Sequence, residues 1–158
     1  MAGVSGAVAR FERAARDRGL DIDVQRFSQG TKTAPDAARA VGCDVGQIVK
    51  SLVFVADGEP VLALTSGRNR ADTAKLAAVL HAREVRRATP DEARTATGFA
   101  VGGTPPFGFP APVRVLMDRD LLGYEMVWAA AGTPDSVFRI TPSELRDAAG
   151  AEIADFRE

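Results

Sequence analysis

An apolar run at residues 48–56, Ile-Val-Lys-Ser-Leu-Val-Phe-Val-Ala, constrains the fold of this 158-residue chain more than any other segment. It is rich in β-branched residues and carries a single charge, so it predicts a strand that is buried on at least one face. The pair Asp57-Gly58 follows directly and is a strong signal for a tight hairpin turn. Residues 60–65 then form the returning strand. This hairpin predicts a fold built around a β-sheet.

Lys50 is the one charged residue in that run. An unpaired buried ammonium is costly, so the side chain must find a partner, reach solvent or face a cavity. The chain has 20 lysines and arginines, of which three are lysine (positions 32, 50 and 75), which leaves 17 arginines. Such a strong preference for arginine indicates that Lys50 meets a need that arginine cannot, such as a compact and movable ammonium.

The remaining elements follow from periodicity and capping signals. Thr89 and Thr141 each begin a Thr-Pro-x-Glu sequence, which is typical of a helix start. We expect helices at 4–18, 33–42 and 72–80 and after Thr89 and Thr141, and short strands at 22–27, 84–87, 113–117, 124–131, 136–140 and 152–155. The sequence shows no repeat, low-complexity tract or second domain. It predicts a single α+β domain over residues 1–158, with a curved, barrel-like sheet of mixed and antiparallel strands flanked by helices.

Composition narrows the classes of protein to consider. No segment approaches the roughly 18 apolar residues of a membrane helix, and the charged first 20 residues do not resemble a signal peptide. The single cysteine, Cys43, excludes an internal disulfide and fits a reducing cytoplasm, so we expect a cytoplasmic protein with no membrane partner. A net charge of −1 disfavours binding of nucleic acid through its backbone alone. A short nucleic-acid end could still contact local arginines such as Arg68 and Arg70, although a solvated surface is the alternative.

The sequence lacks the residues that metal or cofactor chemistry usually needs. One histidine, His81, and one cysteine cannot supply the usual nitrogen and sulfur ligands, and the carboxylates are scattered. There is no phosphate-binding glycine-lysine loop, dinucleotide fingerprint or serine elbow. We therefore expect no metal and no cofactor. Ser51 beside Lys50 suggests a Ser-Lys dyad, but adjacent strand residues point to opposite faces, and Lys50 should share its face with Ile48 and Leu52.

The segment Gly98–Pro112 is a second candidate for function, because its four glycines and four prolines predict an ordered, rigid loop. The adjacent Gly102 and Gly103 would let backbone N–H groups approach one ligand oxygen, as in an oxyanion hole. The alternative is a proline-rich turn whose Phe107 and Phe109 fill the core.

Three stretches, Gly46–Val53, Val101–Gly108 and Trp128–Thr133, occur in an order and spacing that resemble the YbaK/ProX family. That family includes free-standing aminoacyl-tRNA deacylases and the editing domain of bacterial prolyl-tRNA synthetases. The resemblance extends over about residues 20 to 155. It implies an enzyme that hydrolyses the ester between a wrong amino acid and the 3′ end of a tRNA. The substrate would be a small amino acid such as alanine, cysteine, serine or threonine, typically on proline tRNA.

The resemblance also implies a set of site residues. Lys50 would be the key functional lysine, Gly102 and Pro106 the ends of a Gly-x-x-x-Pro loop, and Gly132 part of the turn that closes the aminoacyl pocket. The chain has Thr133-Pro134-Asp135 where the YbaK branch usually carries arginines, which disfavours the cysteinyl-tRNA activity of that branch. The candidates are Lys50, Gly102 and Gly103 for catalysis; Pro106, Gly132, Phe27, Thr31 and Asp135 for substrate binding; and Arg68 and Arg70 for tRNA binding.

An activated ester needs little catalytic machinery, so positioning and electrostatics would suffice without a protein nucleophile. Lys50 would anchor the terminal phosphate or ribose, the Gly102–Gly103 backbone would polarise the ester carbonyl, and water would attack. Lys50 acting as a general base is the alternative. The expected partners are the tRNA acceptor end and a cognate synthetase. Two other functions remain open: a non-catalytic module that binds tRNA or a synthetase, and a hydrolase of another small ester.

Overall fold

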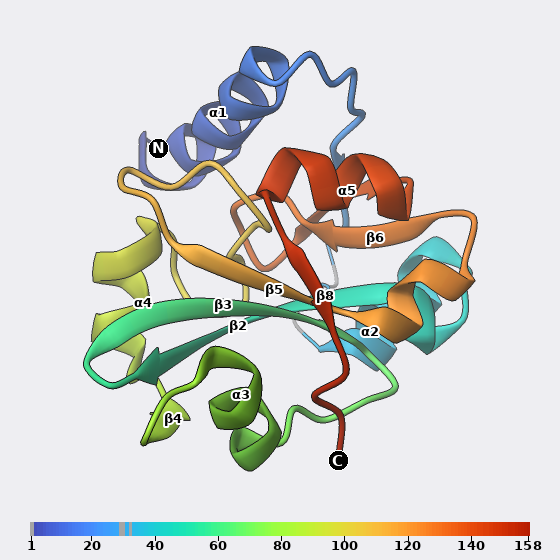
Figure 1. Ribbon diagram of the computed structural model, residues 1–158. Helices are drawn as coiled ribbons and strands as arrows, with labels where there is room; N and C mark the ends of the chain where they lie inside the picture. Colours follow the sequence, from blue (N-terminus) through green and yellow to red (C-terminus); the bar gives the residue numbers. More distant parts are fainter. Residues whose placement is uncertain (1, 29–30, 32) are drawn as a thin grey trace.

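The computed structural model describes residues 2–28, 31 and 33–158, which form a sheet with helices packed on both faces (Figure 1). The helices are α1 (Ala2–Asp17), α2 (Ala34–Val41), α3 (Thr73–Leu80), α4 (Pro90–Thr97) and α5 (Pro142–Ala149), with 3-10 turns η1 (Val45–Gln47) and η2 (Arg119–Gly123). The strands are β1 (Gln25–Arg26), β2 (Ile48–Ala56), β3 (Glu59–Ser66), β4 (Val85–Arg87), β5 (Arg114–Asp118), β6 (Val127–Ala130), β7 (Ser136–Ile140) and β8 (Glu152–Ala154).

The strands form one mixed sheet in the order β1-β7-β6-β2-β3-β5-β8, with β4 also pairing with β2. The β2–β3 hairpin is antiparallel from Val49↔Ser66 to Ala56↔Glu59. Both residues of its turn have positive φ, 48° at Asp57 and 86° at Gly58, as a tight hairpin of this hand requires. Pairs β2–β6, β3–β5 and β5–β8 are parallel. The predicted α+β fold with a curved mixed sheet is confirmed, and the sheet is open, since β1 and β8 end its path.

Strand β2 is incompletely paired on one edge. Along its other edge it pairs with β3 over its full length. On the incomplete edge β6 pairs with Ile48 and Val49, and β4 pairs with residues 54–56. Residues 50–53 have no strand partner there within the described part of the chain. The sheet therefore has a gap beside the most apolar strand of the sequence.

The two faces of β2 belong to different parts of the core. Val49 and Val53 face the main core, which also takes in α1, α4, α5 and the 98–112 loop. On the opposite face, Phe54 packs with α3, and Ile48 packs with α2 and Trp128. Lys50 lies on that second face, between two small apolar clusters and inside neither of them.

Capping predictions hold at both Thr-Pro helices. The Thr89 side chain accepts from Glu92 N, the Thr141 side chain accepts from Glu144 N, and both helices form complete capping boxes.

The predicted strand 22–27 is wrong in length, because Gln25 and Arg26 alone pair with β7. The predicted strand 124–131 is also too long. Asp118 caps η2 by accepting from Asp120 N, and Tyr124 ends that turn before β6 begins at Val127. No helix among the described residues has the length and apolar character needed to cross a membrane.

Candidate active site

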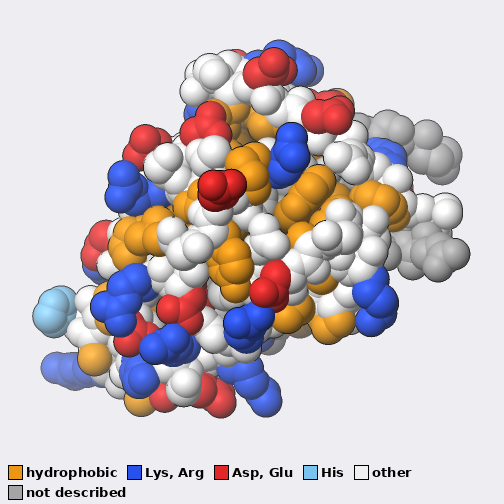
Figure 2. All heavy atoms as spheres, turned by 90° about the vertical axis from the view of Figure 1, so that its right-hand side faces the viewer, with side chains coloured by type: hydrophobic (Ala, Val, Ile, Leu, Met, Phe, Trp, Pro, Cys, Tyr) orange, Lys and Arg blue, Asp and Glu red, His pale blue; other side chains and the backbone are white. Residues whose placement is uncertain are grey.

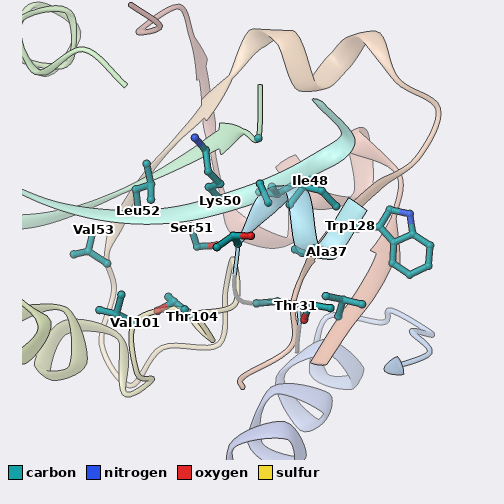
Figure 3. A pocket seen from close by; sticks show the side chains of 18 of the residues that line it. Thr31, Ala37, Ile48, Lys50, Ser51, Leu52, Val53, Val101, Thr104 and Trp128 are labelled. Atoms are coloured by element: carbon teal, nitrogen blue, oxygen red, sulfur yellow. The ribbon is translucent and has the colours of Figure 1, made fainter. Parts of the chain in front are cut away.

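A cavity of about 400 Å³ opens around the unpaired edge of β2 (Figure 3). Its walls come from β2, Thr31, the start of α2 with its cap at Thr33, the loop at 101–104, strand β6, and Arg87 and Ala88 at the end of β4. The volume lies within the range of roughly 300–1,000 Å³ typical of small-molecule sites. The gap in the sheet thus becomes a pocket that reaches both faces of one strand.

Lys50 lies on the face of β2 that carries Ile48 and Leu52, and Ser51 and Val53 point to the opposite side (Figure 3). This is the alternation that a strand imposes, and it separates Lys50 from Ser51 as the sequence predicts. The Lys50 ammonium donates to the carbonyl of Asn69 at 2.5 Å. Burial lowers the pKa of Lys50, the charges of Arg70 and Arg87 lower it further, and Asp118 opposes them in part.

The Asn69 carbonyl is held in place by its own side chain. The Asn69 amide nitrogen Nδ2 donates to Asp118 Oδ2 at 2.9 Å and to Asp120 Oδ2 at 2.8 Å. Asp118 is almost fully buried and also accepts from the backbone N–H of Ser66. Arg157 donates to Asp120 at 2.6 Å. The pKa of Asp120 is lowered mainly by its hydrogen bond from Asn69 and further by Arg157. These bonds hold the chain after β3 in the position where the Asn69 carbonyl accepts from the Lys50 ammonium.

The loop after α4 places one of its two adjacent glycines at the cavity. Gly102, with φ 92°, lines the cavity. Gly103 lies behind it and donates its N–H to Ala100 O at 3.1 Å, so this N–H is engaged within the loop. A Cβ at Gly103 would lie 2.6 Å from Thr133 Cα, which shows how closely the loop packs on the 132–135 turn. The core-filling reading of this loop also holds in part, since Phe107 is buried.

The turn at residues 132–135 packs behind the cavity wall. Gly132 has φ 117°, and a Cβ there would lie 2.9 Å from Ala7 O of α1. Pro134 O accepts from both the N–H and the hydroxyl of Thr31, at 3.0 and 2.9 Å. Asp135 O accepts from the N–H of Phe27, and its carboxylate accepts from the Thr133 hydroxyl. These contacts fix Thr31 at the cavity wall.

Of the substrate and catalytic candidates from sequence, Lys50, Gly102 and Thr31 line the cavity. Gly103 and Gly132 lie in the packed layer behind its wall, where the close contacts of the loop and the turn place them. Pro106 lines a different hollow, between the loop and α5. Phe27 packs against the cluster of Ile48 and Trp128, and Asp135 pairs with Thr133 and Arg26.

The two tRNA-binding candidates differ in their contacts. Arg68 donates to both carboxylate oxygens of Asp44, at 2.7 and 2.8 Å. Arg70 forms no ion pair with any described residue, and its charge acts on Lys50. Arg87 likewise forms no ion pair in the described part of the chain, lines the cavity and stacks over the Phe54 ring. Nothing in the local sequence connects Arg87 with Lys50.

Sequence reasoning gave no site role to three hydroxyl residues that line the cavity, Thr33, Ser51 and Thr104. The nearest signal was a serine inside an otherwise apolar strand. Among the described lining residues there is no aspartate, glutamate, histidine or cysteine. Lys50 and Arg87 are therefore the charged side chains among those lining residues, and burial lowers the pKa of Lys50. No cluster of potential metal ligands occurs within residues 2–28, 31 and 33–158.

Comparison with known proteins assigns the class. Residues 28–148 match the aminoacyl-tRNA editing domain family, so the chain belongs to that family. It is thus an aminoacyl-tRNA deacylase, an enzyme that hydrolyses the ester bond of a mischarged tRNA, and the resemblance seen in the sequence is confirmed.

Individual relatives agree with this assignment. A solved structure described as a candidate trans-editing enzyme for prolyl-tRNA synthetase is 47% identical, with a TM-score of 0.91 over 96% of this chain and 97% of that one. The uncharacterized protein YwhH of Bacillus subtilis (strain 168) is 29% identical over 79% of this chain and 80% of its own length. The proline–tRNA ligase of Nitratidesulfovibrio vulgaris (strain DP4) is 34% identical over 81% of this chain, which spans 22% of that ligase.

Proposed function

We propose that this enzyme removes a small amino acid, such as alanine, cysteine, serine or threonine, from mischarged proline tRNA. The observation that carries the proposal is Lys50, a half-buried ammonium beside a cavity of about 400 Å³ at a gap in the sheet. The proline–tRNA ligase relatives and the trans-editing neighbour support the choice of tRNA. A cognate prolyl-tRNA synthetase is the proposed partner, because the proline–tRNA ligase relatives carry a similar unit within the ligase chain.

The need for such an enzyme follows from the limits of binding selectivity. One methylene in an apolar pocket discriminates by only about 1–3 kcal/mol, so a synthetase cannot reject smaller amino acids by binding alone. A second, hydrolytic site corrects the error after transfer. Its substrate is an activated ester, so the site must orient the bond and exclude competitors more than it must supply reactive groups.

In the proposed reaction, the cations around the cavity mouth hold the acceptor end. Lys50, with Arg87 and Arg70 near it, anchors the terminal phosphate or ribose of the tRNA. The backbone of Gly102 polarises the ester carbonyl. A water molecule adds to the carbonyl carbon, the bond to the ribose oxygen breaks, and that oxygen takes the proton. The products are a free amino acid and a tRNA with an intact terminal ribose.

The proposal is tested by single-turnover hydrolysis of alanyl-, cysteinyl-, seryl-, threonyl- and prolyl-tRNA(Pro). The wild type should hydrolyse at least one mischarged species and spare prolyl-tRNA(Pro). Lys50→Ala should reduce that rate by about 100-fold, the scale of losing one electrostatic contact to the reacting group. Lys75→Ala is the matched control, because Lys75 is exposed, donates to Arg157 O and does not line the cavity.

Two results would contradict the proposal. Unchanged hydrolysis by Lys50→Ala would remove the role assigned to that lysine. Hydrolysis of free small esters at the same efficiency as the tRNA-linked amino acid would show that the acceptor end makes no contribution to recognition.

A further inference from the structure

The hydroxyl of Ser51 is buried and has no hydrogen-bond partner among the described residues. It lies on the side of β2 that faces Val101 and Thr104, across the cavity (Figure 3). A buried hydroxyl without a partner lowers stability, because it loses its hydrogen bonds to water and gains none in return. Such a group in a cavity wall points to a ligand atom that supplies the missing bond.

The main chain of Ser51 is exposed to the same cavity. Ile48 O accepts from Gly67 N on the β3 side, and Val53 O accepts from Ala88 N on the opposite side. Alternate residues of an antiparallel strand direct their main-chain groups to opposite edges, so Ser51 directs its N–H and C=O toward the edge that Val53 uses. Between Val49 and Val53, that edge has no strand partner among the described residues. Ser51 therefore offers both a side-chain oxygen and a carbonyl oxygen to the cavity.

The surroundings favour a small cationic group with an apolar body. Val49 and Val53 flank Ser51 on the same face of the strand and line the cavity. The Thr104 hydroxyl gives its proton to Ala100 O at 3.1 Å, so toward the cavity it can act as an acceptor. No carboxylate is present among the described lining residues. A cation bound here must be held by neutral oxygens.

We propose that Ser51 is a specificity-determining residue that binds the α-ammonium group of the aminoacyl ester through its hydroxyl and main-chain oxygens. The inference rests on the proposed function, since it takes the aminoacyl end to be the ligand of this cavity. The ammonium donates to the Ser51 oxygens, and the amino-acid side chain contacts the neighbouring valines. The pleat of β2 keeps the Lys50 ammonium on the opposite face, so the two cations do not share a binding position.

The test uses two non-hydrolysable RNA microhelices with a proline-tRNA acceptor stem. One ends in a 3′-amide-linked L-alanyl group and the other in a 3′-amide-linked propionyl group, which has the same carbon skeleton without the amine. The wild type should bind the alanyl microhelix roughly 10- to 100-fold more tightly, as expected for a hydrogen bond to a charged group. Ser51→Ala loses the hydroxyl but keeps the main-chain carbonyl, so its preference for the alanyl microhelix should be at least about 10-fold smaller than that of the wild type. An undiminished preference in Ser51→Ala overturns the inference.

Stability separates this role from a structural one. Removing an unsatisfied buried hydroxyl should leave the thermal midpoint of the free enzyme unchanged or raise it, while activity on the mischarged tRNA falls. Ser51→Thr retains the hydroxyl on a strand and should restore the preference for the amine. Ser143→Ala, at an exposed position of α5, should change neither property. A lower midpoint for Ser51→Ala together with an unchanged preference would show a structural serine.

The outcomes also distinguish this inference from the proposed function. If the wild type hydrolyses no mischarged proline tRNA, the proposed function fails. If the wild type hydrolyses one and Ser51→Ala hydrolyses it equally well, the proposed function stands and the assignment of Ser51 fails.

Discussion

At the scale of single residues, the state of Lys50 decides between two mechanisms. Its ammonium donates to Asn69 O, and burial followed by the charges of Arg70 and Arg87 lowers its pKa from the ordinary value of 10.5. An anchoring lysine works as the charged form, and a general base works as the neutral form. The dependence of activity on pH therefore has opposite signs for the two mechanisms.

We expect the kcat/KM of the wild type to fall as the pH rises through the lowered pKa of Lys50, because the anchoring ammonium loses its charge. Lys50→Arg should be less active at neutral pH and should lack this decline, since a guanidinium stays charged. The substrate amine titrates in both enzymes, so the ratio of the two profiles reports Lys50 alone. The measurement is initial-rate deacylation from pH 6 to about 9.5, corrected for spontaneous hydrolysis. If the ratio of the wild-type kcat/KM to that of Lys50→Arg rises with pH, the general-base mechanism is favoured.

The same lowered pKa has a defined effect on stability. Between the lowered pKa and 10.5, the unfolded chain binds a proton at Lys50 that the folded chain does not. Stability conferred by the neutral lysine therefore rises with pH across that interval, and the full cost of the buried charge is present below it. At a pH below that interval, the site thus keeps a charge that folding alone would disfavour.

Residue-level reasoning from sequence succeeded where a local pattern was sufficient. A lysine inside an apolar strand identified Lys50, and strand alternation separated it from Ser51. It could not show that the Gly103 N–H would bond to Ala100 O, because that depends on the path of the loop. It also gave Ser51 no role beyond the rejected dyad, since the gap that exposes Ser51 is created by the ends of β4 and β6.

At the scale of elements, the loop at 98–112 and the turn at 132–135 form one packed unit. Gly103 approaches the backbone of Thr133 so closely that a Cβ would lie 2.6 to 2.9 Å from three of its backbone atoms. Backbone atoms cannot move aside as the end of a side chain can. The position of Gly102 at the cavity therefore depends on the absence of a side chain at the next residue.

Gly103→Ala should separate the loop from the turn and lower the free energy of unfolding by about 1–3 kcal/mol, the usual cost of overpacking. Deacylation should fall as well, because the cavity wall moves. Gly123→Ala is the matched control, since a Cβ there meets nothing within 4 Å. Urea unfolding followed by circular dichroism gives both free energies. Equal midpoints for the two variants would show that the loop can adjust without cost.

Element boundaries were predictable where caps define them and not where pairing does. The Thr-Pro-x-Glu sequences marked the starts of α4 and α5, and Ser136–Ile140 matched β7. The strand expected at 22–27 shrank to two residues, because β7 offers partners only at Val137 and Ser136. The ends of such a strand depend on a segment more than 100 positions away in the chain, so local periodicity cannot predict them.

At the scale of the whole molecule, the distribution of charge matters more than its sum. Basic and acidic side chains are interspersed over the face shown in Figure 2, in keeping with a net charge of −1. Several arginines are neutralised by partners, such as Arg68 with Asp44 and Arg86 with Glu92. Arg70 and Arg87 have no such partner among the described residues and act on Lys50, which makes the surroundings of Lys50 locally cationic.

We therefore expect Arg87→Ala and Arg70→Ala each to weaken binding of the tRNA and to reduce the slope of log Kd against log salt by about one. Arg68→Ala is the comparison variant. Its slope should be nearly that of the wild type, because the Arg68 guanidinium is already bound to Asp44. The measurement is fluorescence anisotropy of a labelled proline-tRNA acceptor microhelix over a salt series. A slope that changes most in Arg68→Ala would relocate the nucleic-acid contact to the Asp44 side.

The global arrangement was the least accessible to sequence reasoning. The hairpin at 48–65 and the number of short strands predicted a curved mixed sheet, and the structure has one. The parallel pairing of β2 with β6 joins residues 48–49 to 128–129, and this crossover sets one end of the gap. No periodicity near Lys50 contains that information.

The gap also gives two neighbouring amides of β2 very different access to solvent deuterium. The Lys50 N–H is directed into the hairpin toward Thr65, so its exchange requires the central strands to separate. The Ser51 N–H faces the cavity and needs only water to enter. A ligand in the cavity would slow exchange at the second amide and leave the first unchanged. Occupancy of the site is therefore distinguishable, at two consecutive peptide groups, from tightening of the whole sheet.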